Sequence, residues 1–163
     1  MDPRLTARSA SVSPLDGAEL HSVNEESIHR LVHGFYDSVR RDPLIGPIFM
    51  RQIEPGRWPA HLSKMCDFWS SVLLRTGRYD GRPLPPHLRL PDLSDAHFAR
   101  WLDLFRVRAR EVFDAADSAC IIALAERIAY SFRLALAFHR GEDSTHVRPQ
   151  TESADAKDAG APA

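Results

Sequence analysis

The sequence predicts an all-α protein, and three observations lead to this prediction. Apolar residues recur every three or four positions in four long segments, which is the spacing of one helix face. No segment shows the sustained polar–apolar alternation that indicates a strand. Proline and glycine residues cluster between the segments, where breaks in the chain are expected. We therefore expect four principal helices joined by short connections.

The first predicted helix has a clear start signal. Asn24 is a candidate N-cap, and Ser22 with Glu25 is a candidate capping box. The Asp-Pro pair at residues 42–43 is expected to end this helix, and a short apolar turn over residues 45–49 to follow it. The apolar stripe of the helix consists of Ile28, Leu31, Val32, Phe35 and Val39.

The second predicted helix starts near Pro59, a residue that suits the first turn of a helix. A break follows over residues 77–91, where four prolines and two glycines forbid a long helix. The stripe of the second helix consists of Trp58, His61, Leu62, Met65, Phe68, Trp69, Val72 and Leu73.

Two further helices complete the domain. Ser94 or Asp92 is expected to cap the third, and a turn over residues 114–117 leads to the fourth, which Gly141 ends as a C-cap. Their stripes are Phe98, Trp101, Leu102, Phe105, Ala109, Val112 and Phe113, and then Ile121, Leu124, Ala125, Ile128, Phe132, Ala135 and Leu136.

The length of 163 residues fits one domain with a sizeable core. We expect residues 1–21 to be a mobile N-terminal extension, residues 22–140 to form the helical domain, and residues 141–163 to be a disordered tail, because the last segment lacks large apolar residues. No internal repeat is visible in the sequence.

The composition favours an ordinary soluble protein. A formal net charge of −1 gives no reason to expect nucleic acid or an anionic membrane as partner. The sequence has neither a signal peptide nor an apolar run of transmembrane length, so a cytoplasmic location is the default. Cys66 and Cys120 are too few for a disulfide framework, and we expect both to be small buried hydrophobes.

The most informative pattern is a set of four polar rings in apolar surroundings: Tyr36, His61, His87 and Trp101. A pocket with one metal-ligating imidazole on one side and hydrogen-bond donors on the other would explain all four, and haem iron has that requirement. The aromatics of the first three stripes, Phe35 among them, and Met65 could line the flat apolar slot that haem needs. Such stripes also occur in ordinary cores.

His87 is the candidate iron ligand. It follows Pro85 and Pro86, which would hold the imidazole rigidly, and neighbouring leucines suggest that the segment packs inward. A histidine in a proline-rich loop is nevertheless more often exposed than ligating, and this alternative stays open at this point.

Tyr36, His61 and Trp101 would supply O–H or N–H donors to a bound ligand. Each hydrogen bond to a partly charged acceptor in a dry pocket contributes about 1–3 kcal/mol. Two or three such bonds would slow oxygen release, which favours redox chemistry or sensing over bulk transport. The alternative is that these are core residues whose polar ends meet backbone carbonyls.

Two other groups of residues are weaker candidates. His29 and His33 are four residues apart and could bind a surface metal, or simply belong to a polar helix face. Arg75, Arg78 and Arg82 lie before His87 and could pair with haem propionates, or keep the connection soluble.

Several stretches together resemble group III of the truncated haemoglobin family, and they extend over most of residues 24–138. They are residues 26–36, 41–49, 58–61, 68–69, 77–84, 87–88 and 98–105. The chain also resembles group III in lacking the glycine pairs that mark other truncated globins. The two terminal segments depart from the family pattern, so assembly and partners do not carry over.

The resemblance implies a shortened globin fold, in which two helices lie over two others around a haem. It places His87 as the proximal histidine, Tyr36 as the distal tyrosine and His61 as the distal histidine. It also places Trp101 in the distal pocket and Phe49 as a wedge against the haem.

The function that this resemblance implies is a protein with haem b iron that binds O₂, NO and CO. A redox or detoxifying role, such as NO dioxygenation or peroxidase-like turnover, would need an external reductase as electron donor. The alternatives are a haem-based gas sensor that acts through a partner and a haem-free helical interaction module. The sequence is compatible with either a monomer or a dimer.

Overall fold

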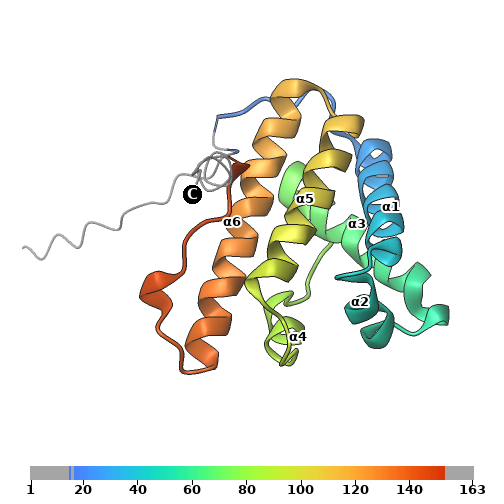
Figure 1. Cartoon of the computed structure of the whole chain (residues 1–163). Helices are drawn as coiled ribbons and strands as arrows, with labels where there is room; N and C mark the ends of the chain where they lie inside the picture. Colours follow the sequence, from blue (N-terminus) through green and yellow to red (C-terminus); the bar gives the residue numbers. More distant parts are fainter. Residues whose placement is uncertain (1–14, 16, 153–163) are drawn as a thin grey trace, which may run out of the picture.

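The computed structural model describes residue 15 and residues 17–152, and Figure 1 shows their arrangement. The described residues form helices and connections, without a strand, which confirms the all-α fold class. The helices are α1 (Glu25–Arg41), α2 (Gly46–Gln52), α3 (Trp58–Leu74), α4 (Leu84–Leu88), α5 (Asp95–Val112) and α6 (Ala115–His139), with short 3-10 turns at Pro55–Arg57 and Ser144–His146.

Helix α1 begins at the expected N-cap but with a different capping partner. The Asn24 side chain accepts the Ser27 backbone N–H at 2.8 Å, and the Ser27 hydroxyl accepts the Asn24 N–H at 2.9 Å. The capping box predicted between Ser22 and Glu25 is therefore wrong. The Ser22 backbone N–H instead donates to the Asp117 carboxylate at 2.6 Å, which ties the start of α1 to α6.

Helix α2 replaces the apolar turn expected after residues 42–43. Pro47 lies in its first turn, where a missing N–H costs nothing. The Asp42 carboxylate accepts the backbone N–H groups of Leu44 and Ile45, each at 3.0 Å, just before the helix begins. Asp42 also accepts Arg100 Nε of α5 at 2.6 Å, so one buried carboxylate fixes this corner on α5.

The turn predicted over residues 114–117 is instead the N-cap and first turn of α6, while the other helix boundaries agree closely with the predictions. Pro59 lies in the first turn of α3, and the proline-rich connection contains only the five-residue α4. Ser94, and not Asp92, caps α5. The Asp114 side chain caps α6 by accepting the Asp117 N–H at 2.8 Å. At the other end of α6 the C-cap is Arg140, one residue before the expected Gly141, which follows with the left-handed φ of +70°.

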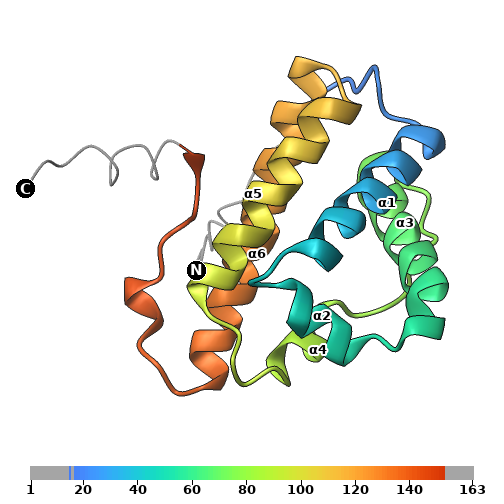
Figure 2. The ribbon, with the colours of Figure 1, turned by 45° about the vertical axis from the view of Figure 1, so that its right-hand side comes forward.

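The helices pack as two layers of two. Helix α1 packs against α3, α5 packs against α6, and the two layers meet mainly through α1 and α5 (Figure 2). The Trp69 ring of α3 also stacks on the Phe105 ring of α5, with 5.1 Å between their centroids. Helix α4 packs against α6 and so brings His87 to the second layer.

Residues 142–152 differ from the disordered tail that we expected over residues 141–163. They run back beside α5 and α6, where side chains of both helices hydrogen-bond to them. Buried arginines on the helices supply the contacts that the polar composition of the segment did not reveal. Residues 153–163 of the expected tail, and most of the N-terminal extension, lie outside the described residues.

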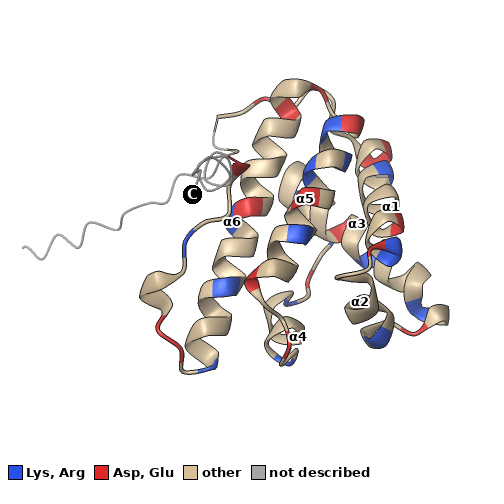
Figure 3. Ribbon diagram, viewed as in Figure 1, with Lys and Arg blue, Asp and Glu red and all other residues tan. Residues whose placement is uncertain are grey.

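The surface carries both charge signs. Figure 3 shows acidic and basic residues together on α5 and α6, in keeping with the net charge of −1. Within the described residues, no helix has the length and apolar character needed to cross a membrane. Cys66 and Cys120 are free thiols and are half-buried, so they are less enclosed than expected.

Candidate haem site

Two of the predicted donors meet where α1, α2 and α3 converge. Tyr36 lies at the edge of the buried stripe of α1, and His61 lies in the first turns of α3. Their ring centroids are 5.1 Å apart with an interplanar angle of 87°. The Phe49 ring of α2 approaches Tyr36 at 5.9 Å. The packing of α3 on α1 thus gathers a phenol and an imidazole at one place.

Burial sets the protonation of both donors. It raises the pKa of the Tyr36 hydroxyl above its usual value, so this group keeps its proton at neutral pH. Burial, followed by the charges of Lys64 and His87, lowers the pKa of His61, which favours the neutral imidazole. The Nε2 atom of His61 is buried and has no hydrogen-bond partner among the described residues. An unpaired buried nitrogen costs about 1–3 kcal/mol, so a ligand that pairs with it would be favoured.

Trp58 is a third polar ring at this place, and the sequence reasoning treated it only as part of an apolar stripe. Its ring lies 5.6 Å from His61 and 6.1 Å from Tyr36, centroid to centroid. Its Nε1 is also buried without a hydrogen-bond partner in the described part of the chain. Trp58 is three residues before His61, a spacing that puts both on one helix face and could have revealed it.

Trp101 reaches this cluster through another ring. It is half-buried on α5 and stacks on Phe105 at 5.3 Å, while its edge contact with Phe35 is at 5.2 Å. Phe35 in turn contacts Tyr36 at 5.0 Å. The Phe35 ring thus lies between Trp101 and Tyr36 in this chain of contacts. Phe35 is only 2% exposed, so it has almost no free surface for a cofactor in this structure.

His87 lies on α4 with its ring against α6. Its Nδ1 is 2.7 Å from the Pro83 carbonyl oxygen, so Nδ1 carries the proton and donates it. The lone pair is then on Nε2, the nitrogen with which a histidine in this tautomer binds a metal. The Phe132 ring of α6 contacts the imidazole at 4.8 Å, a contact that the sequence did not indicate. Burial lowers the pKa of His87, although the bond to Pro83 opposes this, so the neutral form is favoured.

The donor set and its surroundings fit a haem. One imidazole nitrogen is free to ligate, and the protonated donors lie on the other helical layer. Apolar side chains that adjoin the core remain only half-buried, and a flat apolar cofactor would cover such surface. They include Phe49, Met65, Leu88, Trp101 and Phe132.

The weaker candidates are the histidine pair on α1 and the arginines before α4, whose ring and ion-pair contacts lie outside this cluster. The His29 and His33 rings stack at 3.8 Å, and the described residues contain no group of three or more metal-binding side chains. Arg78 pairs with Glu25 at 3.0 Å, at the start of α1. Arg75 and Arg82 are exposed.

The comparisons with known proteins agree with this arrangement. A protein of Campylobacter jejuni subsp. jejuni serotype O:2, described as Group 3 truncated hemoglobin ctb, is 36% identical over 117 residues, which cover 71% of this chain and 92% of that protein. A crystal structure of a group III truncated hemoglobin from Campylobacter jejuni has a TM-score of 0.68 and 36% identity, and the match covers 73% of this chain and 95% of that chain. No family model matches the sequence. The chain therefore belongs to the group III truncated haemoglobins, a family of haem proteins that bind gas molecules.

Proposed function

We propose that this protein binds O₂, NO and CO at a b-type haem and uses bound gas in redox chemistry, not in bulk transport. The observation that carries the proposal is the pairing of His87 Nδ1 with the Pro83 carbonyl, with buried donors on the opposite layer. This arrangement leaves one nitrogen for iron and places buried polar rings on the opposite layer, where they would meet a small ligand.

His87 is the proposed iron ligand. The hydrogen bond to Pro83 fixes the tautomer and raises the basicity of Nε2, as partners of ligating histidines commonly do. The Phe132 ring restricts rotation of the imidazole on its other side. Bound haem would supply an iron atom that takes small gases and exchanges electrons.

Tyr36, His61 and Trp101 are the proposed distal residues, and Phe49 and Met65 the proposed apolar lining. The Tyr36 hydroxyl keeps its proton, because burial raises its pKa, and so acts as a donor. His61 is neutral and offers one N–H, or accepts one hydrogen bond, at its buried Nε2. Donors that hold a partly charged ligand slow its release, which favours turnover over delivery.

Turnover such as NO dioxygenation or peroxide reduction consumes electrons, which we propose come from a separate reductase in the cytoplasm. We base this proposal on the buried donors Tyr36 and His61, since hydrogen bonds from them would slow ligand release, whereas a carrier that delivers oxygen requires faster release. The rings of Tyr36 and His61 are in contact, and we propose that their polar ends meet the ligand together with Trp101.

The test of the proposal is haem binding by the His87→Ala variant, with His139→Ala as the control. His139 is exposed at the end of α6 and its removal should leave haem binding intact. We expect His87→Ala to lose most of its haem on passage over a desalting column, or to bind it with a changed absorption spectrum. Equal haem content and an unchanged spectrum in both variants would contradict the assignment of His87.

A further inference from the structure

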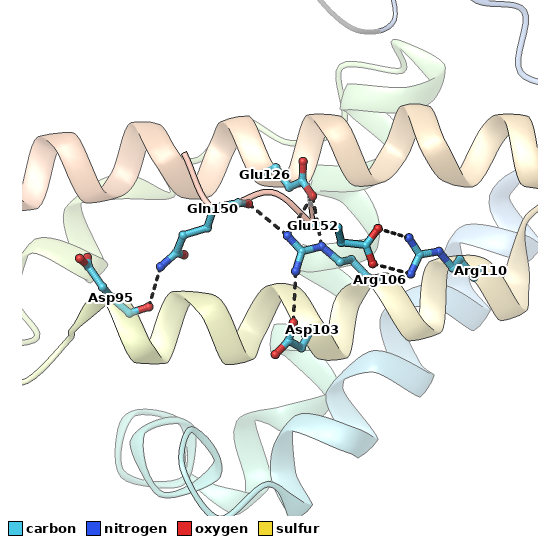
Figure 4. A network of polar contacts seen from close by, with 7 residues as sticks. All are labelled: Asp95, Asp103, Arg106, Arg110, Glu126, Gln150 and Glu152. Carbon is cyan, nitrogen blue, oxygen red and sulfur yellow. Dashed lines mark hydrogen bonds and ion pairs between the residues drawn. The ribbon is translucent and has the colours of Figure 1, made fainter. Parts of the chain in front are cut away.

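Residues 142–152, which we name the C-terminal strap, follow α6 and turn back along α5 and α6. Figure 4 shows Gln150 and Glu152 of the strap between the two helices, together with their partners. At its far end Glu152 forms an exposed ion pair with Arg110, Nη1 to Oε1 at 2.8 Å. The strap is thus attached at several points along its length.

Two buried arginines, one on each helix, make the strongest of these attachments. Arg106 of α5 is 4% exposed, and it donates to Glu126, to Asp103 and, at 3.1 Å, to the backbone oxygen of Gln150. Arg133 of α6 is 7% exposed. A buried guanidinium needs an acceptor for most of its five N–H groups. One backbone oxygen of the strap therefore serves as an acceptor for each side chain.

The second arginine joins the strap to the start of α5. Arg133 Nε donates to the Asp95 carboxylate at 2.9 Å, and its Nη1 donates to the Arg148 backbone oxygen. The Gln150 side chain donates from Nε2 to the backbone oxygen of Asp95 at 2.9 Å. Asp95 is the first residue of α5 and is therefore held from two sides.

The connection between His87 and Asp95 is also held by the C-terminal end of α6. Arg140, just after α6, donates to the backbone oxygens of Leu90 at 3.0 Å and Leu93 at 2.8 Å. Leu90 N–H donates to the His87 backbone oxygen at 3.1 Å. A helix as short as α4 has little stability of its own, so the position of His87 depends on such outside contacts.

We propose that the C-terminal strap positions His87. Gln150 and Arg133 fix Asp95, and Arg140 fixes residues 90–93. These two anchor points together hold α4 so that the His87 imidazole stays against Phe132. The inference rests on the proposed function in so far as His87 is the iron ligand. Gln150 is a positioning residue, because it acts on His87 only through the backbone at Asp95.

The test uses two single-residue variants of the full chain, whose substituted positions on the strap are two residues apart. Gln150→Leu removes the donor to Asp95 without adding charge, while Glu152→Gln weakens only the exposed pair with Arg110. Loss of the hydrogen bond to the Asp95 backbone oxygen, worth about 1 kcal/mol, should raise amide hydrogen exchange at Leu93, His97 and Phe98 by about fivefold in Gln150→Leu. In the reduced haem-loaded protein the iron–histidine stretching band, read by resonance Raman spectroscopy, should shift and broaden.

Faster exchange and a shifted band in Gln150→Leu, with neither in Glu152→Gln, is the expected result. Faster exchange without a band shift, equal effects in both variants, or no effect in either would overturn the inference. If the wild-type protein takes up no haem, the proposed function fails separately, and the NMR resonance of the His87 ring then decides. An unchanged resonance in Gln150→Leu overturns the strap's role, and a shifted one supports it.

Discussion

Replacing Tyr36 by phenylalanine removes one proposed distal donor and keeps the ring. The Tyr36 side chain is 6% exposed, and its ring has edge contacts with Phe49, Trp58 and His61. A phenylalanine therefore fits the same space and should leave the fold and the haem content unchanged. Only the hydroxyl, which keeps its proton because burial raises its pKa, is lost.

The size of the effect follows from this burial. A hydrogen bond to a partly charged acceptor in a dry site contributes about 1.5–3 kcal/mol. Because each ~1.4 kcal/mol corresponds to a factor of ten, Tyr36→Phe should speed O₂ dissociation by about 10- to 100-fold. The direction is fixed, since a phenyl ring offers no donor that could replace the hydroxyl.

The assay is stopped-flow displacement of O₂ by CO from the reduced protein. Tyr79→Phe is the matched control, because Tyr79 packs on Phe68 at 5.3 Å and has only its ring in that contact. The control should keep the wild-type dissociation rate. A Tyr36→Phe variant with full haem content and a rate within about twofold of wild type would refute the placement of Tyr36 beside the ligand.

Three further predictions concern stability. Arg106→Met should lower the free energy of unfolding by about 3 kcal/mol in urea titrations, because it leaves the carboxylate of Glu126 partly buried and unpaired. Arg110→Met, at an exposed position, should lower it by less than about 1 kcal/mol. Equal losses in the two variants would contradict this prediction. Burial alone would raise the pKa of Asp42, but the hydrogen bonds that the carboxylate accepts hold this pKa below 3.8. The ionised Asp42 therefore stabilises the folded protein above pH 3.8, and this stabilisation is lost as the pH falls below that value. Asp42→Asn should therefore flatten the acid limb of a stability–pH curve, and an unaltered limb would count against this assignment. Asn24→Ala removes the cap of α1 and should cost about 1 kcal/mol by the same titration, whereas Ser22→Ala should leave the helical cap intact.

Most helix boundaries were predictable because they depend on local chemistry. Asn24, Ser94 and Asp114 cap their helices through side chains that reach only three residues ahead. Helix α2 was missed because seven residues give too short a periodic pattern, and the groups that support it come from Asp42. Ser22 was misassigned because its true partner, Asp117, is 95 residues away in sequence.

The candidate site was predictable where a polar ring interrupts an apolar stripe. Tyr36 and His61 stand out in this way, and the structure brings their rings into contact. Trp58 does not stand out, because tryptophan is itself apolar and only the three-dimensional packing reveals its unpaired Nε1. Phe132 was likewise assigned to the core, and its contact with His87 depends on how α4 packs on α6.

The order of residues 142–152 was not predictable from composition. The segment has few large apolar groups, which usually indicates disorder. Its attachment depends on Arg106 and Arg133, two buried side chains that donate hydrogen bonds to backbone oxygens of the segment. No local pattern in either arginine's neighbourhood signals that its acceptors are backbone oxygens of a distant segment.

The absorption spectrum of the purified protein tests the central claim most directly, taken as isolated, after reduction with dithionite and after addition of CO. The account predicts an intense Soret band that moves on reduction and moves again with CO, because the proposed ligand His87 would bind a haem iron that also takes a gas. A protein that stays colourless after haem is added would contradict the account and would assign Tyr36, His61, His87 and Trp101 to an ordinary helical core.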